Sequence, residues 1–136
     1  MVKVIMGVKG SGKTKHLIEA INQAVEVETG NIVCIEKKDN LRYDISHRVR
    51  LIESNEYGVD SFQFLKAFIC GLHAGNFDIS HIFIDGIYKI ANSTSLSDAE
   101  SFLLWCDSFG KLNSIDFTVT LSEDIANASE TLKKFF

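Results

Sequence analysis

VKVIMGVKGSGKT, residues 2–14, joins a short apolar run to a glycine-rich loop and then to a lysine and a threonine. Val2–Met6 is rich in β-branched residues and predicts a strand. From Lys13 to about Val27 the apolar residues recur at helical spacing, so we expect a helix directly after the loop. A strand, a glycine loop and a helix in immediate succession indicate an α/β fold.

The alternation of strand and helix patterns continues along the rest of the chain. We expect further strands at Ile32–Ile35, Ile79–Ile84 and Phe117–Leu121, with a short strand at Val49–Ile52. We expect helices at Ser61–Leu72, after a capping box at Ser97-Asp98-Ala99-Glu100, and at Glu123–Phe136, with Gly30 as the C-cap of the first helix. The pattern predicts one α/β domain over residues 1–136, a three-layer fold whose mainly parallel sheet is flanked by helices.

Composition narrows the classes of protein that the chain can belong to. At 136 residues it can form one compact domain but not two. A net charge of −4 disfavours a nucleic-acid motor, although local basic patches remain compatible with it. No apolar run is long enough to span a membrane, and the N-terminus shows no signal-peptide pattern.

The three cysteines, Cys34, Cys70 and Cys106, are widely spaced and form no Cys-x-x-Cys pair. This spacing gives neither a metal ribbon nor a disulfide framework. Cys34 lies in an expected buried strand and Cys106 in an expected helix, so we read both as buried free thiols. Free thiols point to a reducing compartment, and we expect a cytoplasmic protein.

Residues 7–14 match the pattern G-x-x-x-x-G-K-[ST] at every fixed position. Such a loop folds tightly around a polyphosphate, because its backbone N–H groups and the positive end of the following helix face the same anion. Lys13 is expected to reach the β- and γ-phosphates, and the Thr14 hydroxyl to ligate Mg²⁺. The predicted nucleotide-binding residues are Gly7, Val8, Lys9, Gly10, Ser11, Gly12, Lys13 and Thr14.

A carboxylate for the metal side of this site is expected at the end of the strand at Ile79–Ile84. There the apolar residues Ile82-Phe83-Ile84 are followed by Asp85. If the strands are parallel, Asp85 lies at the same sheet edge as Lys13, where Mg²⁺ takes a carboxylate together with phosphate oxygens. The alternative is an ordinary turn, since Asp85-Gly86 is also a turn dipeptide.

On these motifs the chain resembles the P-loop NTPases over nearly its whole length, with Walker A at Gly7–Thr14 and Walker B at Ile82–Asp85. The order of elements is similar to that of the RecA-like branch, in which a later strand inserts between the two motif strands. Phe117–Leu121 matches that later strand. The resemblance implies a γ-phosphate-sensing residue at its end, Thr120 or Ser122, and a helix N-cap at Ser122–Asp124 is the alternative.

Gly86 is a departure from that branch, which commonly carries at this position a Glu that orients the attacking water. Glu36, at the end of the second strand, is a candidate replacement by analogy with families that move the base there. A solvated strand-end charge is the alternative for Glu36. A site without a positioned base still binds nucleotide but reacts slowly.

Two narrower resemblances concern the nucleotide core and the segment after the second strand. The core resembles small bacterial ATP-binding proteins labelled as relatives of pilus-retraction ATPases of the PilT type. Residues 39–43 (DNLRY) and Ser46-His47 resemble a stretch of thymidine kinases, whose acidic base and four-cysteine zinc site have no counterpart in this sequence. One of the three arginines, Arg42, Arg48 or Arg50, is either an arginine finger or pairs with nearby acids such as Asp44 and Glu53.

The sequence therefore supports three functional hypotheses that share one nucleotide site. The first is a Mg·ATP-binding ATPase of low intrinsic rate, completed by a protein partner or by self-association. ATP is favoured over GTP because no Asn/Thr-Lys-x-Asp motif is present. The second hypothesis is a non-catalytic nucleotide sensor or interaction module, and the third is a small-molecule kinase.

Overall fold

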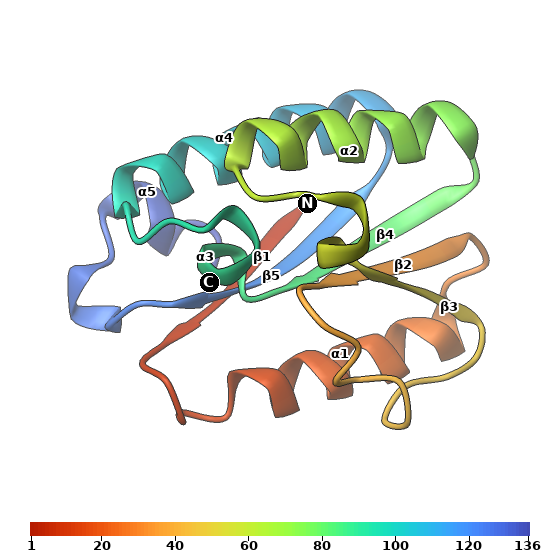
Figure 1. The fold of residues 1–136 in the computed structure, drawn as a ribbon, viewed down its shortest axis with the longest axis horizontal. Helices are drawn as coiled ribbons and strands as arrows, with labels where there is room; N and C mark the ends of the chain where they lie inside the picture. Colours follow the sequence, from red (N-terminus) through yellow and green to blue (C-terminus); the bar gives the residue numbers. More distant parts are fainter.

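The computed structural model describes all 136 residues and is built around a five-stranded sheet whose paired strands are all parallel. The strand order is β1-β5-β4-β2-β3 (Figure 1). The α/β class and the parallel sheet are confirmed, and every expected strand is present to within one residue at each end. The strands are β1 (Val2–Gly7), β2 (Asn31–Glu36), β3 (Val49–Glu53), β4 (Ile79–Asp85) and β5 (Asp116–Ser122).

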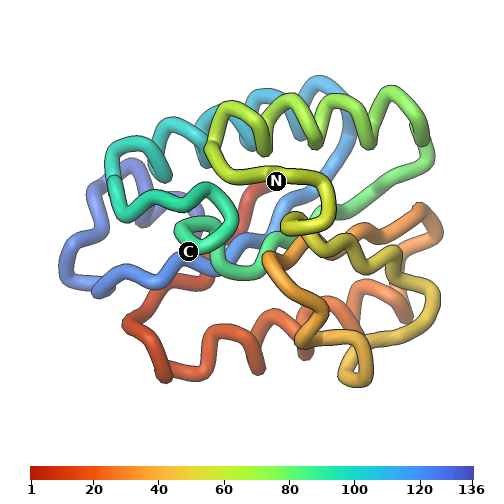
Figure 2. The backbone as a smooth tube through the Cα atoms, viewed as in Figure 1, coloured from red at the N-terminus to blue at the C-terminus, as the bar shows by residue number.

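Helices cover both faces of this sheet. Helix α1 (Lys13–Val27) lies on one face, and α2 (Phe62–Gly75) and α4 (Leu96–Asn113) lie on the other (Figure 1). The segment between β2 and β3 passes on the α1 side of the sheet (Figure 2). Shorter elements are α3 (Ile87–Ala91), α5 (Glu130–Lys133) and the 3₁₀ turns η1 (Ser54–Tyr57) and η2 (Ile125–Asn127). No helix combines the length and the apolar character that crossing a membrane requires.

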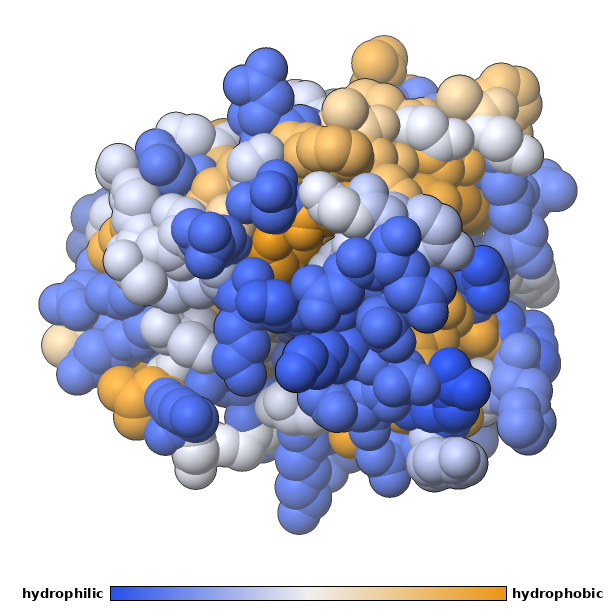
Figure 3. Space-filling model, in the orientation of Figure 1, coloured by the Kyte–Doolittle hydropathy of each residue, from blue (hydrophilic) through white to orange (hydrophobic).

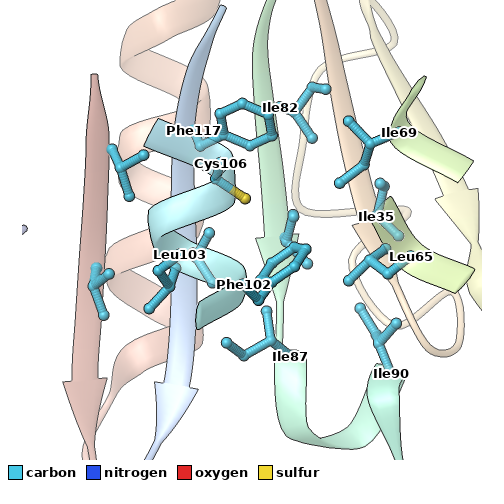
Figure 4. Packing of buried hydrophobic residues seen from close by; sticks show 14 of the residues in the cluster. Ile35, Leu65, Ile69, Ile82, Ile87, Ile90, Phe102, Leu103, Cys106 and Phe117 are labelled. Atoms are coloured by element: carbon cyan, nitrogen blue, oxygen red, sulfur yellow. The ribbon is translucent and has the colours of Figure 1, made fainter. Parts of the chain in front are cut away.

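The sheet separates two hydrophobic cores, and alternate residues of each strand enter different cores. In β2, Val33 and Ile35 belong to the larger core under α2 and α4, whereas Ile32 and Cys34 belong to the smaller core under α1. Figure 4 shows the larger core, where side chains of β2, β4 and β5 meet those of α2, α3 and α4. Burial on both faces explains why the strands read as continuous apolar runs.

The predicted capping box is wrong in its position. Helix α4 begins at Leu96, and Ser95 is its N-cap, with its hydroxyl accepting a hydrogen bond from the Asp98 amide at 3.2 Å. Starting the helix earlier lets Leu96 pack against the larger core. Glu100 does not reach back to the cap and instead accepts a hydrogen bond from Ser129 at 2.8 Å.

The expected long closing helix at Glu123–Phe136 is also wrong. Asp124 caps the 3₁₀ turn η2 by accepting from the Ala126 amide, and Ser129 caps α5 by accepting from the Leu132 amide. These local side-chain hydrogen bonds compete with a continuous helix and divide the segment into two short ones.

Gly30 is not a helix cap, because α1 ends at Val27 with Glu28 as its C-cap. Gly30 instead allows a close approach of chains, since a Cβ there would lie 2.9 Å from the carbonyl oxygen of Asp78. The glycine is therefore needed for packing at the start of β2.

The two edge strands of the sheet, β1 and β3, differ in how they are covered. Beside β1, the amide of Val4 donates a 2.7 Å hydrogen bond to the carbonyl oxygen of Phe135. Phe135 is buried in the larger core, while Phe136 is exposed. The last residues of the chain thus lie along the β1 edge.

Candidate functional site

A pocket of about 920 Å³ lies at the carboxyl-terminal edge of the sheet. It extends from the loop after β1, past the ends of β5 and β4, to the loop after β2. This is the edge at which open parallel sheets bind ligands. Hydrophobic residues gather elsewhere, along the α2 and α4 side of the molecule, while hydrophilic residues cover the middle and lower part of the view in Figure 3.

The loop between β1 and α1 takes a conformation that depends on its glycines. Gly10 and Gly12 have φ angles of 83° and 86°, a region that side-chain-bearing residues rarely adopt. The turn is closed by a 3.1 Å hydrogen bond from the Ser11 amide to the Val8 carbonyl. Gly12 is the N-cap of α1, and no side chain caps the helix, so its first amides remain available to a ligand.

Lys13, the first residue of α1, lies in the pocket and bends back over its own loop. Its ammonium donates a 2.9 Å hydrogen bond to the Val8 carbonyl. Burial lowers the pKa of Lys13, and the nearby charge of Lys89 lowers it further, while Asp85 acts in the opposite direction. The lysine is therefore a partly desolvated cation between a carboxylate and a second lysine.

Asp85 is oriented by hydroxyl groups from two other elements. Its Oδ2 accepts a long 3.4 Å hydrogen bond from Thr14 Oγ1, and its Oδ1 accepts a 2.8 Å bond from Thr120 Oγ1. The Thr120 hydroxyl in turn accepts a 2.7 Å bond from the amide of Gly86. The first turn of α1, β4 and β5 thus meet at one carboxylate, and the structure brings Thr14 and Asp85 together.

Glu36 is also at this edge, directly opposite Asp85 in the register of β2 with β4. Its two oxygens accept hydrogen bonds from the amides of Asn40 at 2.8 Å and Leu41 at 3.1 Å. Burial raises the pKa of Glu36, while these two backbone bonds lower it and Asp85 adds to the rise. Glu36 is 3% exposed, so the solvated strand-end charge considered from the sequence is wrong.

Cations dominate the pocket although the chain as a whole is acidic. Only two carboxylates, Glu36 and Asp85, line it. The sequence patterns did not single out most of the basic residues, although those after β2 and β4 could have been found from their position just beyond strand ends. The six lysines that line the pocket are Lys9, Lys13, Lys15, Lys37, Lys38 and Lys89.

The remaining candidate residues from the sequence do not all lie in the pocket. Ser122 is exposed at the rim of the pocket, whereas Thr120 is 1% exposed and donates its only hydroxyl proton to Asp85. Gly7, Val8 and Ser11 belong to the loop but do not line the pocket. None of the three arginines lines it either: Arg42 pairs with Asp39 at 2.7 Å, and Arg48 donates to the Val25 carbonyl.

No group of three or more His, Cys, Asp or Glu side chains is arranged to hold a metal ion by itself. A scan of protein-family models finds no model that matches the chain, and a search of curated proteins finds no match.

Proposed function

We propose that this pocket binds a nucleoside triphosphate, with ATP favoured over GTP, and that the chain has a P-loop NTPase fold of the RecA-like type. The Gly7–Thr14 loop is the phosphate cradle. The observation that carries the proposal is the hydrogen bond between Thr14 and Asp85, residues 71 positions apart, beside Lys13. A hydroxyl, a carboxylate and a lysine meet there at the end of a strand-loop-helix unit, which is the arrangement that nucleotide phosphates require.

The charge of the pocket supports a polyanionic ligand. Six lysines face two carboxylates in it, so the pocket is positive within a chain of net charge −4. Field lines concentrate in such a cleft and attract anions selectively. The free first turn of α1 adds amide donors to the same site.

The donor set matches Mg²⁺ bound together with a triphosphate. Mg²⁺ retains waters and is held by one or two protein oxygens plus substrate phosphates, so Thr14 and Asp85 are sufficient from the protein side. When bound, the ion neutralises charge on the β- and γ-phosphates. The chain's part is to present the Thr14 hydroxyl and to keep the Asp85 carboxylate oriented through Thr120.

We infer that hydrolysis at this site is slow and that it depends on a protein partner or on self-association. Gly86 has a φ of 74°, so the position after Asp85 suits glycine rather than the glutamate that would orient water. Glu36 is the only other carboxylate in the pocket, and both its oxygens are held by backbone amides. The same two observations favour the second candidate function, a non-catalytic nucleotide sensor.

The cysteines support a cytoplasmic location. Cys34 and Cys106 are buried, unpaired thiols, and such thiols persist in reducing compartments.

Calorimetric titration of Mg·ATP tests the binding proposal. We expect saturable binding by the wild type and a loss of at least about tenfold in affinity for Lys13→Ala, because a charge-assisted contact with phosphate is removed. Lys111→Ala, which alters a surface lysine paired with Asp107 on α4, is the control and should bind as the wild type does. Equal binding by Lys13→Ala and the control would exclude the proposed cradle.

Phosphate release separates the slow ATPase from the sensor. Steady release of phosphate that disappears in Asp85→Ala would support the ATPase. Binding by the wild type without release, together with a nucleotide-dependent change in protease sensitivity, would support the sensor.

A further inference from the structure

The pocket continues past the proposed cradle to a wall formed by other elements. Pairing of β2 with β4 places Glu36 opposite Asp85, so the loop after β2 begins one strand beyond the carboxylate that meets Thr14. Lys37 and Lys38 follow Glu36 directly and line this far part of the pocket. Adjacent strands are about 4.8 Å apart, so this wall lies beside the cradle without being part of it.

Helix α3 contributes a third lysine to the same wall. Its residues Ile87, Tyr88 and Ile90 are buried in the larger core and anchor the short helix there. Lys89 is exposed and lines the pocket, with its aliphatic stem over Gly86, 3.7 Å from where a Cβ of that glycine would stand. The Lys89 stem thus lies next to Gly86, the position at which the RecA-like branch commonly carries a glutamate.

None of Lys37, Lys38 and Lys89 forms a salt bridge within the protein, whereas surface lysines such as Lys111 and Lys133 do. The two carboxylates that flank Lys37 and Lys38 in sequence have other partners: Glu36 accepts from two backbone amides, and Asp39 pairs with Arg42. Three cations therefore face one pocket without an ion-pair partner in the protein. The cradle amides, Lys13 and Thr14 already provide for a triphosphate, so this wall offers charge beyond what the nucleotide needs.

We propose that the far wall, defined as Lys37, Lys38 and Lys89, is a second anion subsite next to the terminal phosphate of the nucleotide. Its ligand is a small molecule that carries a phosphate or carboxylate group. The inference rests on the proposed function, because it takes the terminal phosphate to lie at Lys13 and Thr14. A second anion in this position is where the acceptor of a small-molecule kinase would bind.

Adenosine 5′-tetraphosphate is a suitable probe, since its fourth phosphate extends past the position of the terminal phosphate of ATP. We expect the wild type to bind the magnesium complex of the tetraphosphate about tenfold more tightly than Mg·ATP. The double variant Lys37→Gln/Lys38→Gln and the single variant Lys89→Gln should each weaken binding of the tetraphosphate more than binding of ATP, and so reduce this preference. Lys111→Gln is the matched control and should keep the full preference.

The same titrations contain the results that would overturn the inference. Equal binding of ATP and tetraphosphate by the wild type would mean that no second subsite exists. An equal loss of affinity for both nucleotides in the variants would assign the three lysines to the triphosphate itself. Failure of the wild type to bind either nucleotide would overturn the proposed function and this inference together, and thermal melting of each variant checks that it is folded.

Discussion

Strand β5 carries two buried threonines on the same face, Thr118 and Thr120, which serve opposite ends of the sheet. Thr118 Oγ1 lies 2.9 Å from Nε2 of His81, whose Nδ1 lies 2.7 Å from Oε2 of Glu28. Thr120 bonds to Asp85 and Gly86 at the pocket. Both residues are buried threonines of β5. They differ in their hydrogen-bond networks: that of Thr118 leads through His81 to Glu28, and that of Thr120 leads through Asp85 to Thr14.

At the Thr118 end every polar group is satisfied by the protein. Glu28 also accepts a 2.8 Å hydrogen bond from Ser80, and the His81 ring stacks on Phe83 at 4.0 Å between centroids. At the Thr120 end the chain of contacts leads through Asp85 to Thr14 and into the pocket. The comparison teaches that a buried polar cluster is a candidate site only when its contacts lead to a pocket.

The largest expected effect is a loss of stability when the closed cluster, defined as Thr118, His81 and Glu28, is disrupted. His81→Ala should lower the free energy of unfolding by about 2–4 kcal/mol, because it leaves Glu28 and Thr118 without their partner and removes the stack on Phe83. Affinity for Mg·ATP should remain within about twofold of the wild type. Chemical denaturation and calorimetry measure the two quantities.

His73→Ala is the matched control for that variant. His73 also contacts aromatic rings, tilted against Phe77 and edge-on to Phe109, but its buried Nδ1 has no hydrogen-bond partner. His73→Ala should therefore lower the free energy of unfolding by less than His81→Ala does. Equal costs would show that the closed cluster contributes nothing beyond ring packing.

The threonine pair tests the comparison directly and is expected to have the next largest effect. Thr118→Val and Thr120→Val should each cost about 1–3 kcal/mol of stability, because each leaves buried partners unpaired. Only Thr120→Val should also weaken Mg·ATP binding, since it releases the carboxylate of Asp85. A loss of nucleotide affinity in Thr118→Val of the same size would remove the distinction between the two ends.

A smaller effect is expected for Asp85→Asn, which should weaken ATP binding in the presence of Mg²⁺ and strengthen it in the presence of EDTA. The variant keeps an acceptor for Thr120 and loses the charge, so Mg·ATP should bind about tenfold more weakly. In the presence of EDTA the order should reverse, because the carboxylate no longer repels the free triphosphate. Titrations with and without Mg²⁺ measure this, and an unchanged magnesium dependence would exclude Asp85 from the metal side.

The smallest effect concerns pH and Glu36. Because burial raises its pKa, the folded protein takes up this proton at a higher pH than the unfolded chain does, and the ionised form destabilises the fold. As the pH falls from neutral toward the ordinary glutamate pKa of 4.5, the wild type should therefore gain stability relative to Glu36→Gln. Urea denaturation at several pH values measures the difference.

Glu53→Gln is the control for the pH series. Glu53 lies opposite Glu36 in the register of β3 with β2 and is partly exposed. A change of slope in Glu36→Gln that Glu53→Gln does not reproduce would assign the pH dependence to the buried carboxylate. A slope that is identical for the wild type and Glu36→Gln would contradict the raised pKa.

Much of this fold could be predicted from the sequence, because burial on both faces marks each strand by an unbroken apolar run. Val2–Gly7 and Ile79–Asp85 are examples in which the run ends within one residue of the strand. The capping of α4 was harder, since Ser95 and Ser97 both match a cap and only the packing of Leu96 decides between them. Helix α3 is a single short turn and has no periodicity to detect.

The candidate site likewise has a part that can be predicted from the sequence and a part that cannot. Residues of one contiguous motif, such as Lys13 and Thr14, can be predicted because their spacing along the chain carries the pattern. Motif spacing does not give the neighbours of Asp85, because the strand order β1-β5-β4-β2-β3 decides that Thr120 and Glu36 flank it. The place of β5 follows only from the resemblance to the RecA-like branch. The strand Phe117–Leu121 was expected between the two motif strands, and β5 does lie between β1 and β4.

The hydrogen bond from Val4 to Phe135 has a consequence for self-association. Exposed edge strands invite pairing with strands of other molecules, and here the chain's own last residues occupy part of the β1 edge. Strand addition between copies would then use β3, whose Arg50 is exposed. Pairing of β3 with β3 would be a closed, two-fold contact, so it would yield a dimer rather than an open fibre.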